Sequence, residues 1–100
     1  MSRRSGKVEH LQIVTSTDNS TPGNLSMSPA EILDLLIQNV KTNACYVTVK
    51  EGSNPTADDK GIYLAAGDGV TLEDVRFDYF AVFNATNGQN VTVNVTAFGA

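Results

Sequence analysis

Apolar and polar residues alternate along several short stretches of the chain, and residues typical of turns separate these stretches. Successive side chains of a strand point to opposite faces, so this alternation predicts β-strands with one buried face each. Leu11 and Ile13 mark the buried face of the first predicted strand, and Cys45, Val47 and Val49 mark that of another. The stretches predicted as strands are residues 8–17, 44–52, 62–69 and 70–75, with loops at residues 41–43 and 53–61.

The stretch FDYFAVFNATNGQNVTVNV, residues 77–95, carries the clearest pattern. Asn87-Gly88 lies near its centre, and this dipeptide readily adopts the positive φ angles of a type I′ turn. The sequence therefore predicts a β-hairpin with a two-residue loop. Counting outward from that loop pairs Phe80 with Val95, on a face that is nearly all apolar and belongs to the core.

Residues 28–40 fit two structures. Ser28, Pro29 and Glu31 provide an N-cap, a proline at the first helical position and the glutamate of a capping box. The apolar residues that follow fall on one face of a helix, namely Ile32, Leu33, Leu36, Ile37 and Val40. The alternative is a short turn followed by a buried strand over residues 33–40. The local signals favour the helix, so we expect at least one helical turn after Ser28, and the end of the helix stays open.

These elements define an all-β fold. Six or seven short antiparallel strands with turns between them predict a small β-sandwich, with at most one short helix. Residues 18–28, DNSTPGNLSMS, have turn-forming residues and no apolar pattern, which predicts a loop or an extended arm. One hundred residues make one domain, which we divide into an N-terminal strand and extended arm over 1–28 and the β-sandwich domain over 29–100.

Charge is distributed unevenly along the chain. The net charge is −4, yet Arg3, Arg4 and Lys7 make the first seven residues basic, and the rest of the chain has four basic and eleven acidic residues. A nucleic-acid-binding protein needs a basic face that replaces the counterions of the phosphates, so the acidic body argues against a nucleic-acid partner. The three basic residues are candidate contacts for a protein partner.

The sequence also indicates where the chain is made. One cysteine, Cys45, has no second cysteine to form an intramolecular disulfide, which fits a reducing compartment. The N-terminus has no apolar region of a secretory signal, and no apolar run approaches the ~20 residues of a membrane span. We expect a soluble protein that is synthesised in the cytoplasm and does not associate with membranes.

Catalytic patterns are absent from the sequence. His10 is the single histidine and has no motif around it, and Cys45 reads as a small buried apolar residue. The acidic clusters at residues 58–59 and around Asp68 lack the ligand spacing of a calcium loop. We find no glycine-rich phosphate-binding loop. The sequence therefore predicts a protein that is not an enzyme and binds no cofactor or metal.

Tyr79 and Phe83 are the remaining candidate contacts. They fall on the mixed face of the predicted hairpin, beside threonine and asparagine side chains. Three interpretations stay open for these aromatic rings: packing under a loop of the same chain, contact with another subunit, or binding of a ligand such as a sugar. The last of these makes a carbohydrate-binding surface module an alternative function.

The stretches LLIQNVKTNACYVTV, NPTADDKGIYLAAGDGVTLE and FDYFAVFNATNGQNVTVNV share an order of strands and turns. Over residues 35–95 this pattern resembles small β-sandwich virion structural proteins of tailed bacteriophages. The resemblance implies a capsid cement or decoration protein that binds and stabilises the shell of the major capsid protein, forms a homo-oligomer, and lies on the capsid surface after synthesis in the host cytoplasm. A neck or tail accessory protein of the virion is also compatible with it, and residues 1–28 would be an arm that reaches a neighbouring subunit.

Overall fold

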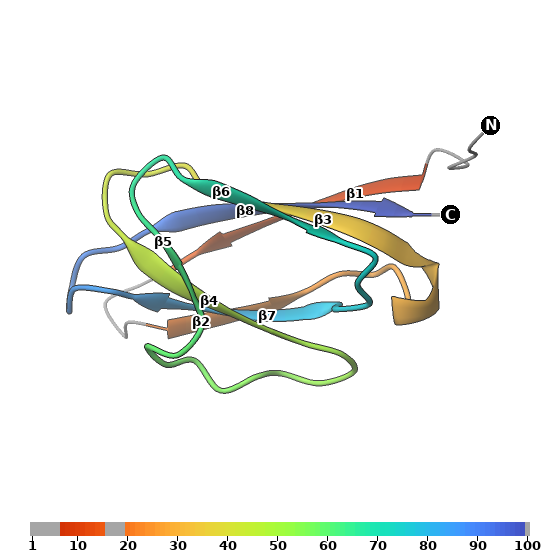
Figure 1. Ribbon diagram of the computed structural model, residues 1–100. Helices are drawn as coiled ribbons and strands as arrows, with labels where there is room; N and C mark the ends of the chain where they lie inside the picture. The colour runs from red at the N-terminus through yellow and green to blue at the C-terminus, as the bar shows by residue number, and fades with distance from the viewer. Residues whose placement is uncertain (1–6, 16–19, 100) are drawn as a thin grey trace.

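The computed structural model describes residues 7–15 and 20–99, which form eight strands and one short 3₁₀ helix (Figure 1). The first strands are β1 (Lys7–Val14) and β2 (Ser20–Asn24), followed by the 3₁₀ helix η1 (Pro29–Glu31). The other strands are β3 (Ile32–Asn39), β4 (Cys45–Lys50), β5 (Ile62–Leu64), β6 (Gly69–Glu73), β7 (Tyr79–Asn84) and β8 (Thr92–Gly99). The all-β prediction is confirmed, with eight strands instead of six or seven.

The strands make two antiparallel sheets that pack face to face (Figure 1). Sheet A has the order β1-β8-β3-β6, and sheet B has the order β2-β7-β4-β5. Strands that follow one another in sequence therefore often lie in opposite sheets, as in a jelly roll, an architecture that occurs in viral capsid proteins, lectins and cupins. The predicted β-sandwich is confirmed, and its topology is that of the jelly roll.

The core lies between the two sheets and contains every second side chain of the central strands. Sheet A contributes residues such as Ile37 and Val95, and sheet B contributes Phe80 and Val82, all of them fully buried. The inward face predicted for β4 is also confirmed at its fully buried Cys45 and Val47. Burial of these apolar side chains is the main contribution to the stability of such a sandwich.

The predicted hairpin over residues 77–95 is wrong. β7 pairs with β2 and β4, whereas β8 pairs with β1 and β3, so Phe80 faces the residues of β8 across the core instead of pairing with Val95 in one sheet. The turn at Asn87-Gly88 is real, because the Gln89 N–H donates to the Thr86 carbonyl at 3.0 Å. Only Gly88 has a positive φ there, at 81°, whereas a type I′ turn needs two such residues. This turn carries the chain from one sheet to the other.

Residues 28–40 begin with the predicted helical turn and then form a strand, which was the less favoured of the two predictions. The capping box of Ser28 and Glu31 closes a single 3₁₀ turn, which confirms the expected helical turn. The helix does not continue, because β3 follows at once and pairs with both β6 and β8. A β-bulge between Ile32 and Asp34 interrupts the alternation of β3. The bulge places Ile32 on the same inward face as Leu35 and Ile37.

Residues 20–24 form a strand, not the predicted loop or arm. β2 pairs with β7 at the edge of sheet B, where its inward positions are Thr21 and Gly23. A Cβ at Gly23 would lie 2.8 Å from the Ile13 side chain, so the glycine lets β1 pack closely over β2. The chain from Lys7 to Asn24 therefore contributes one edge strand to each sheet.

Candidate interaction surfaces

Lys7 is bound within its own chain. It begins β1, and its Nζ donates to the Glu31 carboxylate in η1, with both side chains partly exposed. The hydrogen bond from Lys7 lowers the pKa of Glu31, and the backbone N–H of Ser28 adds to this shift. The other two predicted basic contacts, Arg3 and Arg4, lie outside the described residues.

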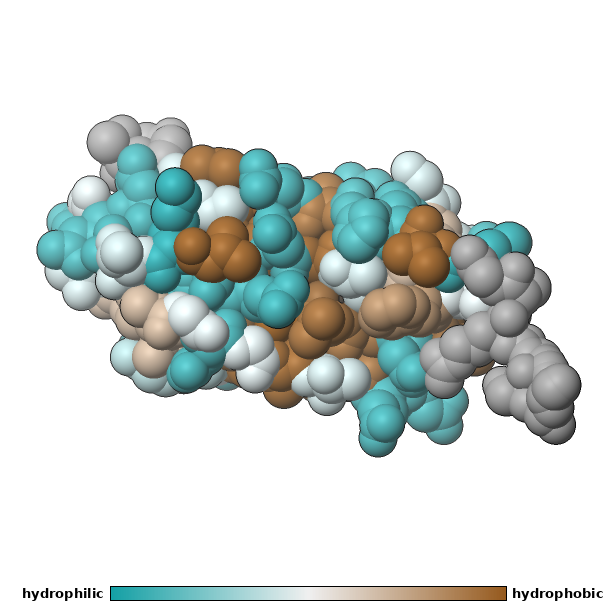
Figure 2. All heavy atoms as spheres, turned by 90° about the horizontal axis from the view of Figure 1, so that it is seen from above, coloured by the Kyte–Doolittle hydropathy of each residue, from teal (hydrophilic) through white to brown (hydrophobic). Residues whose placement is uncertain are grey.

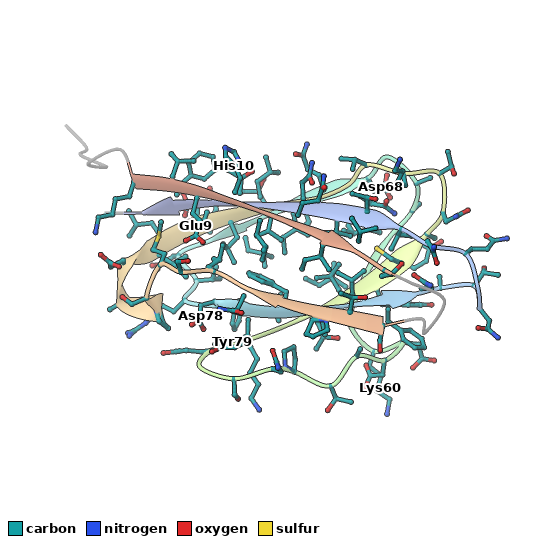
Figure 3. All side chains as sticks on the ribbon, turned by 180° about the vertical axis from the view of Figure 1, so that it is seen from behind. Glu9, His10, Lys60, Asp68, Asp78 and Tyr79 are labelled. Atoms are coloured by element: carbon teal, nitrogen blue, oxygen red, sulfur yellow. The ribbon has the colours of Figure 1, made fainter. Side chains whose placement is uncertain are left out.

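Tyr79 and Phe83 lie on the outer face of sheet B, as the alternation of β7 predicted, but the structure does not bring them together. Ala81 separates them and is only 3% exposed, although it points away from the core. The loop after β4 covers it and leaves a hollow of about 200 Å³, lined by Ser20, Thr21, Pro22, Asn54, Pro55, Ala57 and Ala81. Figure 3 shows Tyr79 on the outer side of this sheet, and the loop passes beneath the same sheet in Figure 1.

Phe83 belongs to a row of aromatic side chains that crosses three strands. Tyr46 pairs with Phe83 on one side and with Tyr63 on the other. The rings of Tyr46 and Tyr63 lie 5.3 Å apart at a tilt of 60°, and Tyr63 is 55% exposed. Tyr46 and Tyr63 were not predicted as contacts, because only the pairing of β4 with both of its neighbours brings them beside Phe83. This row is the aromatic surface of the molecule.

The outer face of sheet A is a second surface, and it was not predicted from the sequence. Figure 2 looks onto it and shows hydrophobic groups separated by hydrophilic side chains. Val8, Val14 and Val40 are about half exposed on this face, whose central positions hold uncharged polar side chains. A shallow hollow of about 460 Å³ lies among them, lined by His10, Leu11, Gln12, Gln38, Asn94 and Thr96.

Hydrogen bonds between neighbouring strands hold the polar side chains of this face in place. The Gln12 amide donates to Asn94 Oδ1 at 3.1 Å, and His10 Nδ1 lies 3.1 Å from Thr96 Oγ1. These contacts join β1 to β8 on the outer side of sheet A, where Figure 3 shows His10 pointing away from the core. The centre of this face is therefore uncharged, and Asp34 and Glu73 lie opposite each other at one end of it. Depletion of charge is a property of the centres of protein interfaces.

The described residues bring together no group of three or more histidine, cysteine, aspartate or glutamate side chains that could hold a metal ion. Cys45 is fully buried, and this burial raises the pKa of its thiol to about 11, so the thiol stays protonated at neutral pH. Nor do the described residues include a helix that is long and apolar enough to cross a membrane.

Comparison with known proteins supports the fold and does not reveal a family. No protein-family model matches the chain, and no curated protein matches it. The cupin domain of Cnp3 from Schizosaccharomyces pombe is similar over the whole chain, with 10% identity and a TM-score of 0.51, and the chain spans 57% of that protein. A structure of Bacillus endospore appendages, which form disulfide-linked pili, has 12% identity and a TM-score of 0.48, with coverage of 96% of this chain and 92% of that one. The similarity to the cupin domain shows only that the two proteins share a β-fold. The similarity to the endospore appendage protein is too weak to support a conclusion.

Proposed function

We propose that this chain is a structural protein of a virion, a capsid cement or decoration protein that binds the shell of the major capsid protein. The observation that carries the proposal is the outer face of sheet A, which has a shallow, uncharged centre edged by half-exposed valines. The resemblance of residues 35–95 to virion structural proteins supports it. The jelly roll is compatible with this role but does not decide it, because the fold serves many functions.

The chemistry of this face suits binding to another protein. A protein interface needs area and complementary shape, and its buried centre contains few charged groups. The hydrogen bonds between Gln12 and Asn94, and between His10 and Thr96, hold polar side chains in fixed positions, so little conformational entropy is lost when a partner covers them. Gln38 is exposed at the centre of the face and is the best position at which to disturb it.

Purified virions provide the first test. The protein should be present in them at a fixed ratio to the major capsid protein, and adding it to particles that lack it should raise the temperature at which the particles break. Labelling the protein in electron micrographs would distinguish the capsid surface from the neck or tail. Absence of the protein from purified virions would reject the proposal.

Two matched variants test the surface itself. Gln38→Arg places a charge at the centre of the outer face of sheet A, and Lys50→Gln changes an exposed position on sheet B. Co-sedimentation with particles should fall for Gln38→Arg and stay at the wild-type level for Lys50→Gln. Equal binding of the two variants would show that another surface contacts the capsid.

The aromatic row favours one alternative function, carbohydrate binding on a virion surface. Tyr63 presents an exposed ring with a hydroxyl group, and Tyr46 and Phe83 extend the aromatic surface beside it. Aromatic rings offer both a flat apolar face and, in tyrosine, a polar group. In a glycan-binding assay Tyr63→Ala should lose binding, while Tyr79→Ala, which lies outside the row, should keep it. Absence of binding by the wild-type protein would reject this alternative.

A further inference from the structure

The outer edge of β1 is the longest open strand edge among the described residues. β1 has eight residues and pairs only with β8. The Thr15 N–H donates to the Val91 carbonyl at 3.0 Å, and the bonded pairs of an antiparallel ladder recur at every second residue from there. Four residues of β1 therefore direct their N–H and C=O groups away from β8, and no described residue pairs with these groups: Val8, His10, Gln12 and Val14.

The edge of β1 is also open in space. Figure 3 looks onto this side of the molecule, and no described segment crosses in front of β1. The other strand edges offer less to a partner: β5 has three residues and β6 has five, and β2 contains Pro22, which has no N–H to donate. An open, long edge strand without proline is a template for pairing with another strand.

The side chains along this edge form a self-complementary pattern. Val8 and Val14 lie at its two ends and are 50% and 54% exposed, with His10 and Gln12 between them. If two copies of β1 run antiparallel about a two-fold axis at Leu11, Val8 of each copy faces Val14 of the other, and His10 faces Gln12. Each half-exposed valine then has an apolar partner.

We propose that β1 pairs with β1 of a second copy of this chain, in the antiparallel register that places Leu11 on the two-fold axis. The two copies of sheet A then form one continuous sheet of eight strands. The open N–H and C=O groups of the edge residues supply the backbone hydrogen bonds of this pairing. Dimers with two-fold symmetry are the commonest homo-oligomers.

The inward side chains are compatible with this register. Glu9 would lie opposite Ile13 of the second copy, so no two carboxylates face each other across the axis. Glu9 itself is held inside its own copy, because its carboxylate accepts the N–H groups of Ser26 and Met27 at 2.7 and 2.8 Å. Figure 3 shows Glu9 between the two sheets, below β1.

Disulfide cross-linking tests both the dimer and its register. In the double variant Val8→Cys/Val14→Cys, the new cysteines of two copies lie opposite each other, at a Cα separation of ~5.5 Å that a disulfide can bridge. Mild oxidation should convert this variant to a covalent dimer, while the buried Cys45 stays reduced. The single variant Val8→Cys should form no covalent dimer under the same conditions, because two copies of residue 8 would be about 20 Å apart.

A second double variant tests whether the two strands pair in a register shifted by two residues. In Val8→Cys/Gln12→Cys the cysteines face each other only if the strands slip by two residues, so it should cross-link poorly. Preferential cross-linking of this variant, or equal cross-linking of the single variant Val8→Cys, would overturn the proposed register.

Sedimentation of the purified protein tests the role of the backbone. His10→Pro removes one outward N–H and leaves the bonds from β1 to β8 intact, whereas His10→Ala keeps that N–H. The wild-type protein and His10→Ala should sediment as dimers, and His10→Pro as a folded monomer by circular dichroism. A wild-type protein that stays monomeric at its highest soluble concentration would overturn the proposal. These experiments contain no particles, so their outcome is independent of the proposed function.

Discussion

β1 and β2, the first two strands of the described chain, are both edge strands, yet they are built in opposite ways. β1 has eight residues and contributes Leu11 and the buried Ile13 to the core, and its outer edge is open. β2 has five residues, STPGN, whose inward positions carry only a threonine and a glycine, and Pro22 interrupts its outer edge. β1 is held by side-chain packing as well as by its pairing with β8, and the backbone groups of its outer edge are available. β2 depends on its pairing with β7, and its outer edge is blocked.

This difference shows how one chain controls which of its edges can pair. Proline on an edge strand removes a donor that a foreign strand would need, at little cost to the ladder on the other side. The two strands still depend on each other, because Gly23 leaves the space that Ile13 fills and Glu9 binds the backbone that follows β2. Substitutions on either strand therefore test the comparison directly.

The largest effect is expected from Ile13→Ala in β1. The Ile13 side chain is 3% exposed, and replacing a buried isoleucine by alanine costs about 2–5 kcal/mol, because apolar contacts are lost and a cavity remains. The matched change in β2, Thr21→Ala, removes a partly exposed side chain and should cost less than half as much. Urea denaturation gives both values. If Thr21→Ala lowers the free energy of unfolding as much as Ile13→Ala does, β1 and β2 do not differ in how strongly side-chain packing holds them.

Glu9→Gln should have the second-largest effect, because Glu9 links β1 to the segment after β2. Its two carboxylate oxygens accept the Ser26 and Met27 N–H groups, and glutamine would present an NH₂ group to one of these donors. Leaving a buried donor without an acceptor costs about 1–3 kcal/mol, and the loss here should be near the lower end because the Met27 N–H is only partly buried. The free energy of unfolding and the hydrogen exchange of the Met27 amide measure the loss.

The exposed Glu73 provides the control for this change. Glu73→Gln should leave the free energy of unfolding within about 0.5 kcal/mol of the wild-type value, as is usual for surface substitutions. Equal stability of Glu9→Gln and Glu73→Gln would show that the carboxylate of Glu9 does not hold the two strands together.

The same comparison explains how much of the fold the sequence could predict. Alternation is a local property, so Leu11 and Ile13 in β1, and Cys45 and Val47 in β4, identified their strands and buried faces correctly. β2 was not predicted, because its inward positions carry no apolar side chain. The alternation of apolar and polar residues, which identified the other strands, is therefore missing from it. The pairing of strands could not be predicted from local alternation wherever two strands that are neighbours in sequence lie in opposite sheets.

The turn at Asn87-Gly88 shows why pairing failed. The same apolar alternation in β7 and β8 fits two strands that pair in one sheet and two strands that face each other across the core, and only the long-range partners decide between them. For the same reason Phe83 was placed on the correct outer face while its neighbours Tyr46 and Tyr63 were missed. The proposed surfaces depend on pairing, so the sequence identified single residues of them but not their arrangement.

Pro22→Ala tests whether proline blocks the edge of β2. The variant gains an N–H on the open edge, and it should lose about 0.4–1 kcal/mol of stability because the unfolded chain becomes more flexible. Sedimentation should show more self-association than in the wild-type protein. Pro29→Ala, at the start of η1 and outside every strand, provides the proline control. Association of Pro22→Ala at the wild-type level would show that something else protects β2.

The smallest effect is expected where β1 begins, at the ion pair of Lys7 and Glu31. The pKa of Glu31 is lowered in the folded chain, first by the hydrogen bond from Lys7, so the pair adds stability above the ordinary pKa of 4.5. That contribution is lost as the pH falls through the lowered pKa, because the carboxyl then takes up a proton. Lys7→Met should therefore be slightly less stable than the wild-type protein at pH 7, and the two should converge in acid.

The control for this pH dependence is Lys60→Met, since Lys60 is exposed and forms no ion pair among the described residues. Its difference in unfolding free energy from the wild-type protein should not change through the titration of Glu31. An NMR titration of the Glu31 carboxyl gives the same answer at one site, because its pKa should rise in Lys7→Met and stay unchanged in Lys60→Met. If both variants follow the same pH curve, Lys7 is held at the start of β1 by the strand itself, and the basic side chain remains available to a partner.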